Sequence, residues 1–289
     1  RSGSPEVQTR QIQAVIDRCA QEGGGVVVVP AGTFNTGALF FRQGTHLHVT
    51  ECGTLLGSDR IIDYPIATTR IEGETCKYFV ALINADGLDG FTITGTGTID
   101  GNGLQYWQEF WIRRSWNPQC TNKDAQRPRL TYVSNSQNVT IQDVHLINSA
   151  FWTNHFYRSE RIKYLYCTIY APHEPQDAKA PSSDALDLDV CRDVLVHGCD
   201  ISVNDDAVVL KGGKGTWADK DPSNGACERI LIEDRHASFV DEVPEGLTVT
   251  ADESKISSVV TNYITNACHH VSEGGTIRIS TGDKGKDRV

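Results

Sequence analysis

Short β segments recur along the middle of the chain at a nearly constant spacing, and this recurrence constrains the fold more than any other feature. Five such segments, rich in β-branched and aromatic residues and separated by Gly, Asn and Asp, lie at 91–94, 139–142, 163–166, 194–197 and 230–233. Strands of fixed period interrupted by inserts are typical of a solenoid whose coils stack on one another. We therefore expect an all-β chain built as a parallel β-helix.

The intervals between these segments set the expected length of a coil. The interval from Ile93 to Ile141 is twice the interval from Ile141 to Leu165, so we interpret the first as two coils and the second as one. The next two intervals are longer than one coil, and their excess falls on polar inserts at 171–183 and 212–225, of the kind that lines a binding face. An antiparallel β-sandwich is the alternative, but it explains the near-constant period less well, and Asn-Gly hairpin turns are few.

A helix is expected before the coils and should cap their N-terminal end. Apolar residues follow the spacing i, i+3, i+4, i+7, and three glycines from Gly23 end the pattern. The four valines at 26–29 then indicate a buried strand. The apolar helix positions are Ile12, Val15, Ile16 and Cys19.

Three aspartates, Asp184, Asp205 and Asp206, stand out within the repeat. The interval from Asp184 to Asp206 is close to the length of one coil. Stacked strands lie about 4.8 Å apart, so the three carboxylates should meet on one patch of surface. Neighbouring carboxylates resist ionising together, so one tends to keep its proton. A protonated acid beside an ionised base is the arrangement that hydrolyses a glycosidic bond. The alternative is that these are ordinary corner residues of a solenoid.

The charge balance narrows the class of partner. The net charge is −10 and the pI about 5.3, which argues against a nucleic-acid partner but not against acidic sugars, which need only a local cluster of Lys and Arg. No apolar run approaches a membrane span and no signal peptide is present. The chain begins at Arg1 and contains no Met, which indicates a processed or trimmed product. Its nine cysteines have no metal-site spacing, and we expect no metal and no cofactor.

Six stretches resemble glycoside hydrolase family 28, the polygalacturonases and rhamnogalacturonan hydrolases, and together cover about residues 5–239. The most specific are 181–189 and 203–215, where the family's Asn-Thr-Asp-Gly appears as Ser-Ser-Asp-Ala and its Asp-Asp pair is retained. The resemblance implies a right-handed parallel β-helix of the pectin-lyase-like kind. The other stretches are 23–34, 54–64, 95–102 and 149–155.

The resemblance also implies roles. Asp205 would be the general acid that protonates the leaving oxygen, while Asp184 and Asp206 would position and deprotonate the attacking water, inverting the anomeric carbon. Lys211 and Lys214 are candidates to bind a galacturonate carboxylate, although a solvated loop is the alternative for both. The segment 105–129, rich in aromatic and basic residues, is expected to form one wall of the cleft.

The chain departs from the family after about residue 233. The family continues with a Gly-His-Gly turn and, one coil later, an Arg-Ile-Lys that grips substrate. At the first of these places this chain has 239–242, Phe-Val-Asp-Glu. Because orientation supplies much of an enzyme's rate acceleration, we expect activity to be weak or absent.

The segment 240–289 indicates a different unit, a short α/β segment with an amphipathic helix at 252–270. It resembles the start of the ATP-binding domain of sensor histidine kinases. In that family two Asn on one helix face coordinate Mg²⁺ and phosphates, and here they would be Asn262 and Asn266. The chain ends before the Gly-rich loop of that domain, so we do not expect useful ATP binding. The expected domains are 1–239 and 240–289.

The leading hypothesis is a glycosidase of pectic polymer, expected to be a monomer and, as a pectinase, to be secreted or periplasmic. Its partner would be an acidic plant cell-wall polysaccharide. The alternatives are a non-catalytic carbohydrate-binding solenoid, a pectate-lyase-like eliminase that requires Ca²⁺, and an ATP-binding signalling fragment.

Overall fold

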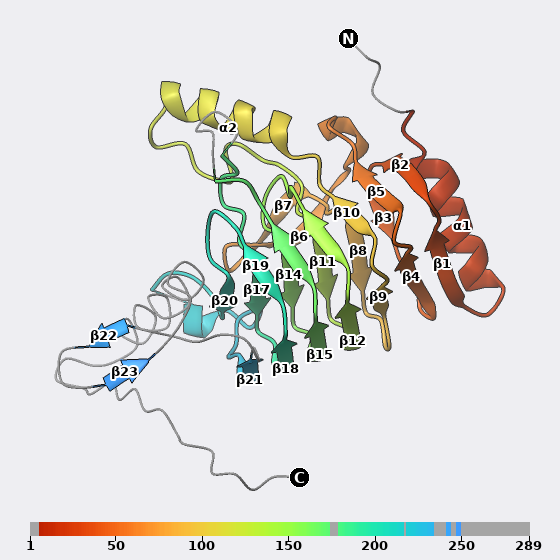
Figure 1. Ribbon diagram of the computed structural model, residues 1–289. Coiled ribbons are helices and arrows are strands. Elements are labelled where there is room, and N and C mark those ends of the chain that lie inside the picture. The colour runs from red at the N-terminus through yellow and green to blue at the C-terminus, as the bar shows by residue number, and fades with distance from the viewer. Residues whose placement is uncertain (1–5, 174–178, 217, 234–240, 244–246, 250–289) are drawn as a thin grey trace, which may run out of the picture.

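Three parallel sheets run along the molecule, each built from one strand of successive coils (Figure 1). The computed structural model describes residues 6–173, 179–216, 218–233, 241–243 and 247–249. The first sheet has the order β1 (Gly25–Val29), β4 (Thr45–Val49), β9 (Thr92–Thr94), β12 (Gln137–Gln142), β15 (Glu160–Leu165), β18 (Arg192–His197) and β21 (Glu228–Glu233).

The other two sheets repeat this order of coils. The second contains β2 (Gly32–Thr36), β5 (Gly53–Gly57), β10 (Thr98–Asp100), β13 (His145–Ile147), β16 (Thr168–Tyr170) and β19 (Asp200–Ser202). The third contains β3 (Leu39–Phe40), β8 (Ile83–Asp86), β11 (Thr131–Ser134), β14 (Asn154–Tyr157), β17 (Leu186–Asp189) and β20 (Val208–Lys211). The chain is therefore a right-handed parallel β-helix, as expected, and the sandwich alternative is wrong.

The register corrects the expected number of coils. β9 pairs directly with β12, Ile93 facing Ile141, so the long interval between these residues is one coil and not two. The extra length is an insert between β10 and β11 that contains helix α2 (Leu104–Trp116). An insert whose length is near one coil cannot be told from a coil by counting residues.

The core is the space between the three sheets. Alternate residues of each strand point inward, so apolar side chains of successive coils stack in ladders. One such ladder in the first sheet joins Ile93, Ile141, Tyr164 and Val196, all nearly or fully buried. Burial of each such side chain contributes about 1.5–3 kcal/mol, and the ladder also fixes the register because a one-residue slip would expose all of it.

Helix α1 (Thr9–Gln21) covers the N-terminal end of the coils (Figure 1). Ile16 is fully buried and Ile12 packs against the core, as the spacing predicted, whereas Val15 is exposed. The strand β1 beneath it is not buried on both faces as expected, because Val26 and Val28 face solvent.

A β-hairpin interrupts the coils between β5 and β8. Its strands β6 (Ile66–Ile71) and β7 (Glu74–Phe79) are antiparallel and joined by Glu72 and Gly73, both with positive φ, as a type I′ turn requires. A Cβ on Gly73 would lie 2.7 Å from the carbonyl carbon of Gly213, so only glycine allows the hairpin tip to press against the loop that follows β20.

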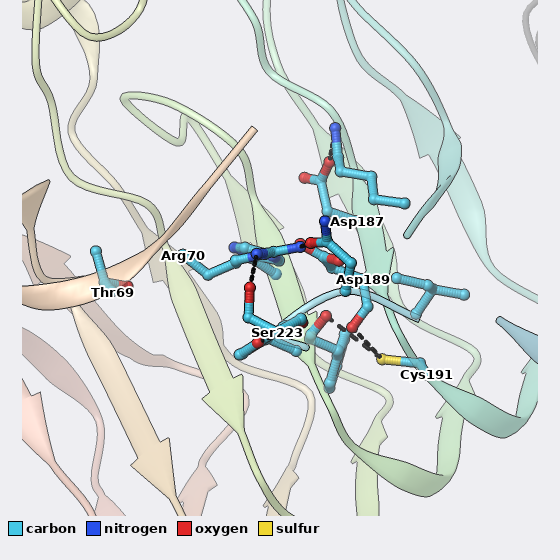
Figure 2. Close-up of polar contacts among 12 residues, drawn as sticks. Thr69, Arg70, Asp187, Asp189, Cys191 and Ser223 are labelled. Atoms are coloured by element: carbon cyan, nitrogen blue, oxygen red, sulfur yellow. Dashed lines mark hydrogen bonds and ion pairs between the residues drawn. The ribbon is translucent and has the colours of Figure 1, made fainter. Parts of the chain in front are cut away.

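Arg70 anchors this hairpin to the third sheet. Its guanidinium pairs with Asp189 at 2.9 Å and donates to Ser223 Oγ at 3.0 Å (Figure 2). The two side chains of the ion pair are at most 1% exposed. The pair therefore joins the hairpin to the last coils under cover from water.

The remaining described elements are short. Two 3₁₀ turns lie at Ile61–Asp63 and Ala218–Lys220, and β22 (Asp241–Val243) pairs antiparallel with β23 (Leu247–Val249). The expected helix at 252–270, with Asn262 and Asn266, lies outside the described residues. None of the helices described has both the length and the apolar character to span a bilayer.

Removing the hairpin anchor should destabilise the fold strongly. Arg70→Met leaves the Asp189 carboxylate buried without its main partner, which costs about 3–5 kcal/mol of unfolding free energy, measurable by urea denaturation at pH 7. Arg42→Ala is the matched control, because it breaks an exposed pair with Asp17 and should cost less than about 1 kcal/mol. Equal losses in the two variants would contradict the anchoring role.

Candidate active site

A cleft of about 950 Å³ opens over the C-terminal part of the third sheet. The hairpin tip and the loop after β20 both line it, as do Asn122 and Ser182. Its charged lining comes from several segments and consists of Glu72, Asp184, Asp205, Lys211, Lys214, Asp219 and Asp221.

The register between β17 and β20 brings the predicted acids together. Leu186 faces Val208, and the acids lie just before these strands. The amide of Ala185 donates to the carbonyl of Asp206 at 2.9 Å, so Asp184 and Asp206 are neighbours in adjacent coils. Asp184 and Asp205 line the same cleft.

Hydrogen bonds fix the loop that carries the acid pair. The amide of Asn204 donates to Ser183 Oγ at 3.0 Å, and its side-chain amide donates to the carbonyl of Ala180 at 2.8 Å. The amide of Asp206 donates to Asp205 Oδ1 at 3.1 Å. These bonds tie the Asp205-Asp206 turn to the segment that precedes Asp184.

Two of the three acids hold their protons more tightly than usual. Burial, and then the charge of Asp187, raises the pKa of Asp184 well above its ordinary value; Lys211 opposes this, while Asp205 and Asp206 add to it. Asp205 is exposed at the cleft, and partial desolvation, followed by the charge of Asp206, raises its pKa. A carboxyl that stays protonated in such company is what a general acid requires.

The two predicted lysines differ in their surroundings. The Lys211 ammonium lies 2.8 Å from Asp187 Oδ1 and 3.7 Å from Asp184 Oδ2. It also lies 4.1 Å from the ring centroid of Trp152. Lys214 is exposed on the rim, 2.7 Å from a Glu72 carboxylate oxygen. Both line the cleft.

Asp187 and Asp189 were not identified from the sequence. They occupy alternate positions of β17 and are fully buried although they point away from the core. Burial raises the pKa of Asp187 to about 6, against the opposing charge of Lys211. Burial would also raise the pKa of Asp189, but hydrogen bonds with His155 and Arg70 outweigh it and hold that pKa below its usual value. The sequence did contain a signal for them, because two Asp alternate with two Leu in this strand and so lie on its outward face.

Only part of the segment 105–129 forms a wall of the cleft. Asn122 lines it, whereas Trp107 is buried and donates to the carbonyl of Ser149. The buried Arg127 guanidinium holds this wall in place by donating to the side-chain oxygen of Asn122 and the carbonyl of Pro181. Burial lowers the pKa of Arg127 to about 10, so it remains a cation at neutral pH.

In the described part of the chain, no group of three or more His, Cys, Asp or Glu side chains has the arrangement of a metal site.

The fold and the acids together define a parallel β-helix with a carboxylate-lined cleft on its outer face. The chain belongs to the glycosyl hydrolases family 28, whose family model matches residues 28–226.

Several known proteins are similar to this chain. A probable polygalacturonase of Vitis vinifera is 28% identical over 204 residues, 68% of this chain and 39% of that protein. An endo-polygalacturonase of Pectobacterium carotovorum is 27% identical over 218 residues, covering 72% and 52%. The solved family 28 exopolygalacturonase of Yersinia enterocolitica superposes with a TM-score of 0.67 at 21% identity, covering 81% of this chain and 46% of that one. This chain thus spans about half, or less, of the length of these proteins.

Removing the neighbouring charge should release the proton of Asp205 at lower pH. Asp206→Asn abolishes the repulsion that helps raise the pKa of Asp205, so that pKa should fall toward the ordinary value of about 3.9. Carboxyl ¹³C NMR titration of labelled aspartate measures it. Asp219→Asn, which removes a carboxylate from the rim of the same cleft, should leave the Asp205 titration nearly unchanged. An unaltered Asp205 midpoint in Asp206→Asn would contradict the coupling.

Proposed function

We propose that this chain hydrolyses glycosidic bonds of pectic polysaccharide, with Asp184, Asp205 and Asp206 as its catalytic residues. The observation that carries the proposal is that Asp184 and Asp205 line one cleft, with Asp206 next to Asp184 on the adjacent coil. Membership of family 28 and the polygalacturonase names of its relatives support the choice of reaction and substrate.

The proposed scheme is inverting hydrolysis, in which Asp184 can act as a base only in its ionised form although its pKa is raised. Asp205, whose pKa is raised above its ordinary value, would protonate the leaving glycosidic oxygen. Asp184 and Asp206 would hold a water and take its proton as it attacks the opposite face of the sugar. Each step uses a side chain of this chain, with no metal and no cofactor in the scheme.

The proposed substrate is an anion, and two lysines that line the cleft, Lys211 and Lys214, carry the opposite charge. Lys214 on the rim is exposed and would exchange Glu72 for a substrate carboxylate. Lys211 lies deeper and is already held by Asp187. Pectic chains, which carry a carboxylate on each galacturonate, fit a cleft with cations beside its acids.

The chain lacks two family motifs after β21, and their absence is expected to affect the rate of turnover. The places where the family has its Gly-His-Gly turn and Arg-Ile-Lys fall after residue 233, and the family match ends at residue 226. We propose that turnover is slow for this reason. The division into 1–239 and 240–289 is likewise a proposal. The resemblance of 240–289 to an ATP-binding domain, with Asn262 and Asn266 as a vestigial nucleotide motif, has no support from the relatives above.

Replacing the proposed acid should abolish most turnover. Asp205→Asn removes general-acid catalysis, worth about 10²–10⁴ in rate, so kcat on polygalacturonate should fall by that factor with little change in KM. Reducing-sugar release measures it, on rhamnogalacturonan as well. Asp193→Asn, on the outer face of the first sheet, is the control and should retain wild-type activity.

Three results would overturn the proposal. Equal rates for Asp205→Asn and the wild type would remove Asp205 from the reaction. Loss of activity with chelator, together with an unsaturated product absorbing in the near ultraviolet, would identify an eliminase. Binding of polygalacturonate by the wild type without any turnover would identify a binding solenoid.

A further inference from the structure

Two buried aspartates and a partly buried lysine meet at the cleft, and the hydrolytic scheme gives a role to only one of the three. Asp184 is the proposed catalytic carboxylate, and Asp187 and Lys211 lie against it. We propose that Lys211, fixed in place by Asp187, is a positioning residue that orients Asp184 and sets its charge. This inference rests on the proposed function and assigns Lys211 a task other than gripping the substrate.

The ammonium of Lys211 is held from several sides. Asp187 Oδ1 lies 2.8 Å from it, Asp184 Oδ2 lies 3.7 Å from it, and the Trp152 ring faces it with the centroid at 4.1 Å. The Lys211 side chain is only 18% exposed. If this ammonium moved to a sugar carboxylate, the buried Asp187 would lose its counter-ion, which is energetically costly.

Trp152 is itself closely packed, so the ring that the Lys211 ammonium contacts is held rigidly. Its indole is 3% exposed and stacks on Phe151 with 4.8 Å between ring centroids. The backbone nearby is paired too, because the carbonyl of Asp184 accepts from the amide of Thr153 at 2.7 Å. The Lys211–Asp184 geometry is therefore set before any substrate arrives.

One cation serves two carboxyl groups in this cluster. Neither oxygen of Asp187 accepts a hydrogen bond of good geometry within the described residues, so the charge of Asp187 depends on the nearby ammonium of Lys211. Burial raises the pKa of both carboxyls, and Lys211 opposes the rise in both. Lys211 thus favours the ionised form of Asp184, whereas burial and Asp187 favour its protonated form.

Other charged groups face the cluster from each element packed against it. Asp205 and Asp206 face Asp184 from the turn before β20. Arg127 faces Asp184, and Arg129 faces Asp187, from the segment before β11. Asp189 faces Lys211 from the strand β17. These groups remain in every variant below, so the variants report on Asp187 and Lys211 alone.

Opposite substitutions should move the activity in opposite directions along the pH axis. Lys211→Met removes the cation, so Asp184 keeps its proton to higher pH. Asp187→Asn removes the nearest negative charge and leaves the ammonium to Asp184, so Asp184 ionises at lower pH. Lys211→Arg keeps the cation and should restore the wild-type profile. Charge pairs at this distance shift a pKa by about 1–3 units.

The test has two readouts. The first is the pH profile of kcat/KM on polygalacturonate. The midpoint of its acidic limb should move to higher pH in Lys211→Met and to lower pH in Asp187→Asn, by about one unit or more in each variant. The second is the carboxyl ¹³C titration of Asp184 without substrate, which should show the same two directions. Thermal unfolding of each variant checks that it is folded. If Lys211→Met does not fold, Lys211→Gln takes its place.

Three outcomes would overturn the inference. A raised KM in Lys211→Met with the acidic limb and the Asp184 titration unmoved would make Lys211 a substrate-binding residue. Lower kcat in both variants without either shift would make the pair merely structural. If the Asp184 pKa moved in the same direction in Lys211→Met and Asp187→Asn, the positioning role of Lys211 would also be excluded. A wild type without turnover would refute the proposed function, while the Asp184 titration would still decide the role of the pair.

Discussion

The parallel register between β17 and β20 is the constraint on which the candidate site depends. Leu186 faces Val208, and this single offset brings Asp184 beside the Asp205-Asp206 turn and places Asp187 within reach of Lys211. The inward residues Leu186, Leu188 and Val208 are buried, so a slip by one residue would expose apolar side chains and also dissolve the cluster of acids. Core packing and site geometry are therefore enforced by the same pairing.

The outer face of the third sheet carries charge that is largely covered from water. The buried ion pair of Arg70 with Asp189 anchors the hairpin β6–β7 to it, and the partly buried Lys211 pairs there with the buried Asp187. His155 is neutral in this setting, because burial lowers its pKa to about 3. Charges without water are tolerated only when paired. The pairing also holds groups rigidly, which a catalytic floor requires.

The sequence predicted the features that depend on a local period. The strands of the first sheet and the one-coil offset between the acids follow from spacing alone, as does the helix at the N-terminus. The coil containing α2 was misjudged because its insert happens to match a coil in length. Asp187, Asp189 and Arg70 were missed because their contacts join residues far apart in the chain. The turn at Glu72-Gly73 was detectable, since Gly at a two-residue turn between alternating runs indicates a hairpin.

Solenoids are quasi-one-dimensional, so coils usually contact only their neighbours and can fray from an end one at a time. The hairpin of this chain departs from that pattern, because Arg70 bonds to Asp189 and Ser223, which lie 119 and 153 positions further along. Opening the last coils must also break a dry ion pair with a hairpin that belongs to an early coil. The stack should therefore lose its coils as a single cooperative block between hairpin and cleft, and the acids should persist in place until that block melts.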